Sequence, residues 1–195
     1  MIFEPHPALA GTSRVGTIAE SSQHISTGEI VTLVILGVSA ACWSAFIRIP
    51  MRIPGSSLMY AVLPIALGFA VVPRQLAGTA MSASAVLAAS LMTVTGVNHF
   101  GVGAMTSLLA IGPLLDLALA RARTGWRLYF GFVSAGVAAN LFAFSLRGGS
   151  KLFGLDAPGL RPFQDWLSQA ALTYVLAGGV AGLLSAACWL RLRRQ

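Results

Sequence analysis

The sequence predicts an all-α polytopic membrane protein, a single bundle of six transmembrane helices, and two observations carry this prediction. Of the 195 residues, 10% are charged and 56% are apolar, which leaves too little polar surface for a soluble domain. The charges also gather in short gaps, and none lies between Glu29 and Arg48, between Arg127 and Arg147, or between Asp165 and Arg191. These intervals match the roughly 20 apolar residues that a helix needs to cross the ~30 Å hydrocarbon layer.

Six spans account for the pattern: Glu29–Ile47, Ser57–Val72, Gln75–Gly96, Val102–Ala120, Trp126–Leu146 and Trp166–Leu190. The first, fifth and sixth follow from the charge-free intervals, and the third and fourth lie in a stretch whose only charged residue is Asp116. Pro73 ends the second span and leaves a tight turn into the third, because proline cannot continue a helix. The second span is short for a membrane crossing.

Residues 1–28 are expected to form a flexible tail, and residues 29–195 the transmembrane domain. The tail has the Ser, Thr, Gly and Pro content of a mobile segment. It lacks the basic and apolar regions of a cleaved signal peptide. Four tryptophans fall near predicted span ends, as an aromatic belt at the membrane interface requires: Trp43, Trp126, Trp166 and Trp189.

The distribution of cations predicts the orientation. One side of the bundle carries seven arginines: Arg74, Arg121, Arg123, Arg127, Arg191, Arg193 and Arg194. The other side carries five cations: Arg48, Arg52, Arg147, Lys151 and Arg161. The positive-inside rule then places both termini in the cytoplasm. The membrane that we expect is the bacterial inner membrane. We interpret the net charge of +7 as contact with the lipid bilayer rather than with nucleic acid.

Small residues recur at every fourth position on three spans, as on the first at Gly37, Ala41 and Ala45. Such stripes let helix backbones approach closely in lipid. Two interpretations stay open: the stripes pack within one bundle, or the first of them docks a separate membrane subunit. Asp116, the carboxylate within the fourth span, has a similar pair of interpretations, because it can pair at a helix end with Arg121 or Arg123 or contact a partner subunit.

The candidate ligand-binding residues lie on the external side: Arg48, Arg52, Gly55, Ser56, Asn98, His99 and Asn140. The prolines around the first four disfavour regular helix, so backbone groups and Ser56 can face a ligand. Asn140 lies within the fifth span, where a buried amide needs a partner. The alternatives are that the arginines anchor helix ends to headgroups, that His99 solvates a turn, and that Asn140 pairs with a neighbouring helix.

The third external loop, from Arg147 to Asp165, is expected to be long and glycine-rich, as binding loops and lids often are. Enzyme chemistry is not predicted. The three histidines give no metal-ligand spacing, no catalytic triad is legible, and there is no Gly-rich loop ending in Lys-Ser/Thr. We therefore expect no metal, no cofactor and no ATP site on this chain.

Several segments resemble the substrate-capture (S) subunits of energy-coupling factor transporters, a family of micronutrient importers. They are the small-residue stripe of the first span, the external Arg52-Ile-Pro-Gly-Ser56 segment, Ile111–Leu117 and Ala138–Leu141. The resemblance implies that the chain captures a vitamin-like small molecule outside and docks on a transmembrane coupling subunit driven by two ATPase subunits. Gly37, Ala41 and Ala45 would fill the docking role. The initial Met-Ile-Phe departs from members that take up nickel or cobalt.

We therefore predict a membrane-embedded, non-enzymatic substrate-capture subunit of an ATP-driven uptake transporter. The competing hypothesis is a membrane scaffold or assembly protein, whose small-residue stripes and basic tail serve only protein and lipid contacts. An intramembrane enzyme using His99 and Asp116 is disfavoured, because the predicted topology puts these residues near opposite faces of the membrane.

Overall fold

The computed structural model describes residues 26–46, 57–121, 126–153 and 163–193, and these ranges contain helices and no strands. The helices are α2 (Thr27–Phe46), α3 (Ser57–Val71), α4 (Ala77–Val94), α5 (Val102–Arg121), α6 (Trp126–Leu152) and α7 (Phe163–Arg193). The predicted all-α architecture with six helices is confirmed, and each predicted span corresponds to one of these helices.

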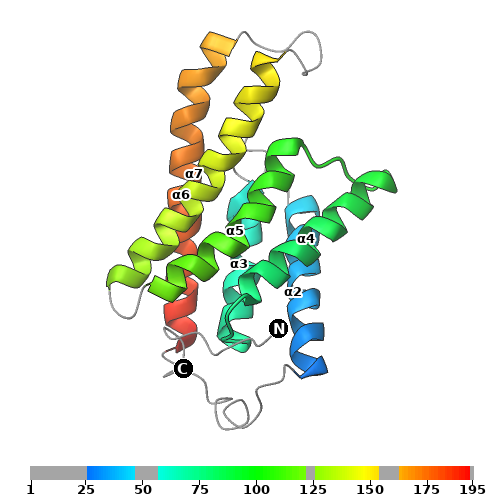
Figure 1. Cartoon of the computed structure of the whole chain (residues 1–195), viewed down its shortest axis with the longest axis vertical. Coiled ribbons are helices and arrows are strands. Elements are labelled where there is room, and N and C mark those ends of the chain that lie inside the picture. Colours follow the sequence, from blue (N-terminus) through cyan, green and yellow to red (C-terminus); the bar gives the residue numbers. More distant parts are fainter. Residues whose placement is uncertain (1–25, 47–56, 122–125, 154–162, 194–195) are drawn as a thin grey trace.

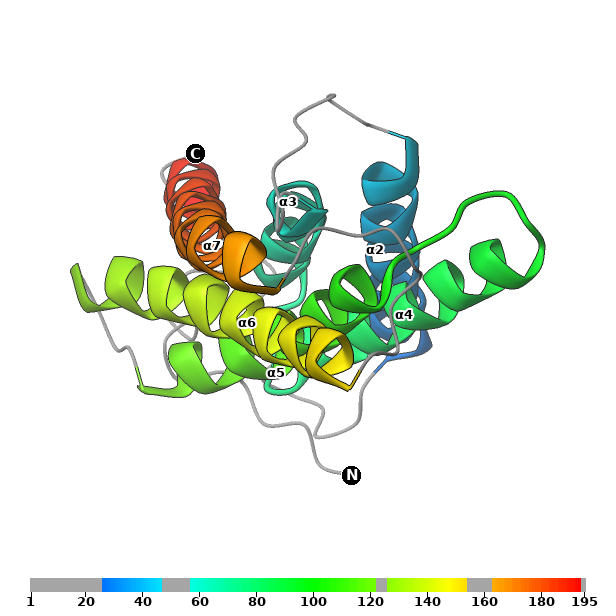
Figure 2. The same ribbon diagram turned by 90° about the horizontal axis from the view of Figure 1, so that it is seen from above.

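The helices form two layers that pack face to face (Figures 1 and 2). Seen from above, α7, α3 and α2 form one layer and α6, α5 and α4 the other. Contacts run around a ring, in which α2 packs on α3 and α4, α7 on α3 and α6, and α5 on α4 and α6. Successive helices alternate in direction, so α2 begins at the end of the bundle where α7 ends. We call this end basal and the opposite end distal.

Five helices are long and apolar enough to cross a membrane: α2, α4, α5, α6 and most of α7. Their outward faces carry exposed leucine and valine side chains, such as Leu87, Leu91 and Val94 on α4. A soluble protein buries such residues, and a membrane protein places them against lipid. The chain is thus a helical membrane bundle. The 15 residues of α3 span only about 22 Å, and this short helix contacts four other helices, α2, α4, α5 and α7.

The first helix begins earlier than the sequence analysis expected. The Ser26 hydroxyl accepts a hydrogen bond from the Gly28 amide, and the Glu29 carboxylate accepts one from the Ser26 amide at 3.0 Å. This reciprocal arrangement is a capping box, which starts a helix by satisfying its first free amides. Residues 26–28 therefore belong to the bundle rather than to the tail, whose residues 1–25 lie outside the described part.

The last two helices are longer than predicted. Residues 147–152, expected to open a loop, continue α6, and residues 163–165 begin α7. Gly148 is buried, so packing holds this part of α6 in a helix despite the low helix propensity of glycine.

The prediction of an aromatic belt at the membrane interface was wrong for Trp189, which is 3% exposed and packs against Phe132 at 6.4 Å between ring centroids. Trp126, 73% exposed, fits an interfacial position.

Glycines set the closest helix crossings. A Cβ atom added at Gly112 of α5 would collide with Ser82 and with the backbone of Gly78 on α4. A Cβ at Gly178 of α7 would lie 2.6 Å from the Gly136 carbonyl oxygen of α6. Only glycine permits backbones to approach this closely, and such contacts hold helices together in lipid through dispersion.

Candidate functional site

The predicted ligand-binding residues divide into those that the structure describes and those that it does not. Arg48, Arg52, Gly55 and Ser56 lie outside the described residues. Asn98 and His99 follow α4, and Asn140 lies on the distal half of α6. Of the described candidates, Asn98 and His99 therefore lie at the distal end of the bundle, and Asn140 lies near the middle of α6.

Asn140 is the most buried of them, at 0% exposed. Its side-chain Nδ2 donates a hydrogen bond to the backbone oxygen of Tyr174 on α7, with a distance of 3.0 Å. An amide inside an apolar bundle needs such a partner, because its desolvation otherwise costs free energy. The interhelical pairing that the sequence analysis kept open for Asn140 is thus confirmed.

Tyr174 joins Asn140 to the surface of the distal end. Its ring lies 5.6 Å from that of Phe144. Its hydroxyl oxygen is 3.3 Å from the position of a Cβ at Gly103, and Arg147 Cδ is 3.7 Å from the same position. The phenol and the aliphatic stem of Arg147 thus both lie beside the first turn of α5, at Gly103, which has no side chain.

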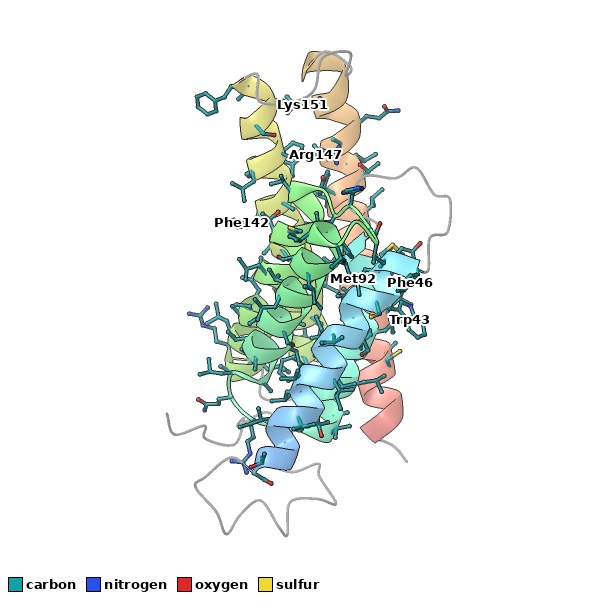
Figure 3. The ribbon with its side chains drawn as sticks, turned by 90° about the vertical axis from the view of Figure 1, so that its right-hand side faces the viewer. Trp43, Phe46, Met92, Phe142, Arg147 and Lys151 are labelled. Carbon is teal, nitrogen blue, oxygen red and sulfur yellow. The ribbon has the colours of Figure 1, made fainter. Side chains whose placement is uncertain are left out.

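We call Asn140, Arg147 and Tyr174 the distal polar cluster. Arg147 is exposed and lies with Lys151 near the distal end of α6 (Figure 3). Tyr174 is buried, in a small core separate from the main one and shared with Ala143 and Ala170. Sequence reasoning missed Tyr174, because aromatic residues are common in apolar spans and no local pattern marks this one.

The connection between α4 and α5 is a compact turn. Gly96 adopts a left-handed φ of 74°, which glycine tolerates without strain. The backbone amide of Asn98 donates a hydrogen bond to the Met92 carbonyl at 3.2 Å, so the turn folds back onto the last turn of α4. Asn98 is buried and His99 is exposed. The exposure of His99 agrees with the interpretation that it solvates this turn.

The residues predicted to dock a partner lie inside the bundle. Ala41 and Ala45 are buried, and a Cβ at Gly37 would collide with Met81 and Ser84 of α4. Helices of the same chain therefore cover this stripe, as the alternative interpretation held. The predicted docking role of Gly37, Ala41 and Ala45 needs correction, because a stripe filled by neighbouring helices has no room for a partner.

Asp116 also has an internal task. Its Oδ2 accepts hydrogen bonds from the Thr79 amide at 2.8 Å and the Thr79 hydroxyl at 2.7 Å, and its Oδ1 accepts one from the Gly78 amide at 3.1 Å. These amides belong to the first turn of α4, which has no cap of its own because Leu76 occupies that position. A carboxylate there satisfies the free donors and complements the helix dipole. Asp116 is a cap provided by α5 rather than a docking contact.

A cavity of about 350 Å³ lies away from the distal polar cluster, between the last turns of α5 and the first turns of α6. Arg121 and Arg127 line it at the basal end. Among the described residues, no group of three or more His, Cys, Asp or Glu side chains is placed to hold a metal ion.

Comparison with family models, curated proteins and solved structures gave no match. The resemblance to transporter S subunits therefore stays a prediction from short sequence segments.

Proposed function

We propose that this chain is the membrane-embedded substrate-capture subunit of an ATP-driven uptake transporter, taking up a vitamin-like nutrient. Partner chains, a transmembrane coupling subunit and two ATPase subunits, would supply ATP hydrolysis. The chain would lie in the bacterial inner membrane with its termini and the basal end in the cytoplasm. The observation that carries the proposal is the distal polar cluster, in which two helices contribute a buried amide near the middle of α6, a phenol, and a guanidinium nearer the distal end.

The composition of this cluster suits a small polar ligand. The Asn140 amide and the Tyr174 phenol each offer hydrogen-bonding groups, and Arg147 offers a positive charge. Binding sites in helical bundles are built between helices from a few such groups on apolar walls, and Phe144 and Ala143 supply apolar surface here. A ligand at this depth meets a lower dielectric than in water, which strengthens each polar contact.

The proposed coupling contact must use an outward face of the bundle, because the Gly37 stripe is covered by the chain itself. The scaffold alternative has the same requirement, because a scaffold partner would also have to bind an outward face of the bundle. The identity of the partners therefore separates the two functions. Recovery of ATPase subunits with the chain from mild detergent supports the transporter, and a stoichiometric complex that contains no ATPase supports the scaffold.

Ligand capture is tested by native mass spectrometry of the complex for a co-purifying small molecule. Replacing Asn140 with leucine should abolish retention of that molecule and leave partner recovery unchanged. Ser145→Ala is the matched control, because Ser145 lies on the same helix, is exposed, and donates its hydroxyl to the Leu141 carbonyl of that helix. Equal retention by the wild type and the Asn140 variant would contradict the proposed site.

A further inference from the structure

The basal cavity between α5 and α6 has apolar walls and a cationic mouth. Its walls are Leu114, Leu117 and Ala118 of α5, and Phe130, Gly131, Ser134, Ala135 and Ala138 of α6. At its mouth lie Arg121, the last residue of α5, and Arg127, the second residue of α6. From these features we infer that the cavity binds an anionic phospholipid, with the phosphate between the two arginines and one acyl chain along the apolar walls.

The length of the cavity matches one leaflet of the bilayer. Arg127 and Ala138 are 11 residues apart on α6, which corresponds to a rise of about 16 Å. Half of the ~30 Å hydrocarbon core is about 15 Å. Trp126, 73% exposed beside the mouth, is of the type that lies at the headgroup level. The mouth thus lies where phosphates are found, and the walls reach toward the bilayer centre.

The size of the cavity suits an acyl chain. Its volume of about 350 Å³ lies between α5 and α6 and opens outward, where lipid meets the bundle. A partner helix, about 10 Å in diameter with its side chains, would rest on the rim of the cavity, whereas a single hydrocarbon chain can lie within it.

The charge pattern favours an anionic headgroup. No aspartate or glutamate occurs in the sequence from Leu117 to Leu155, and the nearest one before it, Asp116, is engaged by α4. Arg121 lies at a helix C-terminus, where a cation is favoured, but Arg127 lies at the N-terminus of α6, where the helix dipole disfavours one. A phosphate beside Arg127 complements both the guanidinium and the dipole.

Native mass spectrometry of the detergent-purified full chain tests this site, with phosphatidylglycerol and phosphatidylcholine of identical acyl chains as probes. We expect one phosphatidylglycerol to bind at least 10-fold more tightly than phosphatidylcholine. The affinity of the double variant R121Q/R127Q should be roughly 25-fold lower, at about 5-fold for each arginine. Lys151→Gln removes a cation from the distal end instead, and it should leave the affinity unchanged.

A second variant separates the lipid from a soluble anion. Ala138→Phe fills the apolar end and keeps both arginines, so it should reduce phosphatidylglycerol binding about 10-fold. R121K/R127K keeps the charges and should restore most of the binding lost in the glutamine variant. The proposal is overturned by equal binding of the two lipids, by an unchanged affinity in R121Q/R127Q or A138F, or by full competition from millimolar inorganic phosphate. A melting temperature measured without lipid shows that each variant is folded.

Discussion

The two ends of the bundle use buried polar residues in different ways. At the basal end, the Asp116 carboxylate accepts three hydrogen bonds from the start of α4. Glu29 accepts a hydrogen bond from the Ser26 amide and forms an ion pair of 3.1 Å with Arg74. At the distal end, Asn140 and Tyr174 lie in a small separate core. A charged residue within a span can thus stabilise the fold by capping a neighbouring helix.

The helix crossings differ between the ends as well. Near the basal end, Gly78 and Gly112 bring the backbones of α4 and α5 into direct contact. In the distal part of α6, a Cβ at Gly149 would meet nothing within 4 Å. The basal part is therefore the more closely packed at its glycines, and we expect its polar and glycine contacts to be the more costly to disturb.

The largest expected effect comes from Asp116→Ala. The variant leaves the Gly78 and Thr79 amides without their acceptor in an apolar environment, which should lower the free energy of unfolding by about 3 kcal/mol. Asp116→Asn retains one acceptor oxygen and should lose about 1 kcal/mol. Unfolding in detergent, followed by circular dichroism, measures both. If Asp116→Ala leaves the free energy of unfolding unchanged, the cap does not stabilise α4.

Gly112→Ala is expected to rank second. The added methyl group meets the Gly78 backbone and Ser82, which cannot both move away, so we expect a loss of about 2 kcal/mol. Gly149→Ala is the matched control in open space, where the better helix propensity of alanine should stabilise the protein by up to about 1 kcal/mol. The two substitutions thus have opposite predicted signs in the same unfolding assay, and a shared sign would refute the packing argument.

Asn140→Leu should cost about 1 kcal/mol of stability, because a single interhelical hydrogen bond in a membrane contributes about that much. Under the proposed function, the same variant loses nutrient retention by more than 10-fold. Measuring unfolding and retention on one preparation separates the two effects. If retention falls only in proportion to the unfolded fraction, then Asn140 holds α6 to α7 and does not bind a ligand.

The smallest expected effect comes from Glu29→Gln at the basal end. The variant removes the ion pair with Arg74 and weakens the capping box, and because Glu29 is partly exposed we expect a loss of about 0.5 kcal/mol. The difference in stability between the variant and the wild type should shrink as salt rises from 0.05 to 0.5 M, because the Debye length falls about three-fold over that range. A difference that does not change with salt would indicate that the capping box, not the ion pair, accounts for the loss.

Much of the fold was predictable from the sequence, and most errors lie at helix ends. The charge-free intervals predicted the helices within a few residues, except where α6 runs on through Gly148 and Gly149. Glycine pairs usually end a helix, and only the packing of the buried Gly148 shows that this one continues. The start of α2 differs from the prediction for another reason, because Ser26 and Glu29 have the spacing of a capping box and begin the helix two residues earlier.

The candidate site was less predictable. Asn140 was identified from its position within a span, but its partner on α7 is 34 residues away. Asp116 was identified as unusual for the same reason, and its partners on α4 are 37 and 38 residues away. Tyr174 was missed because aromatic residues are common in apolar spans, so that nothing in the local pattern separates a core tyrosine from one beside a buried amide.

Charge and hydropathy along the chain are enough to predict a helical membrane bundle and the positions of its helices, because lipid requires each span to satisfy its own backbone. The folded arrangement was needed to learn which helices share a layer, that the Gly37 stripe packs internally, and that Asp116 caps α4. Those outcomes depend on which backbones can approach at glycine crossings and on hydrogen bonds between distant segments. Neither is encoded in any local window of residues.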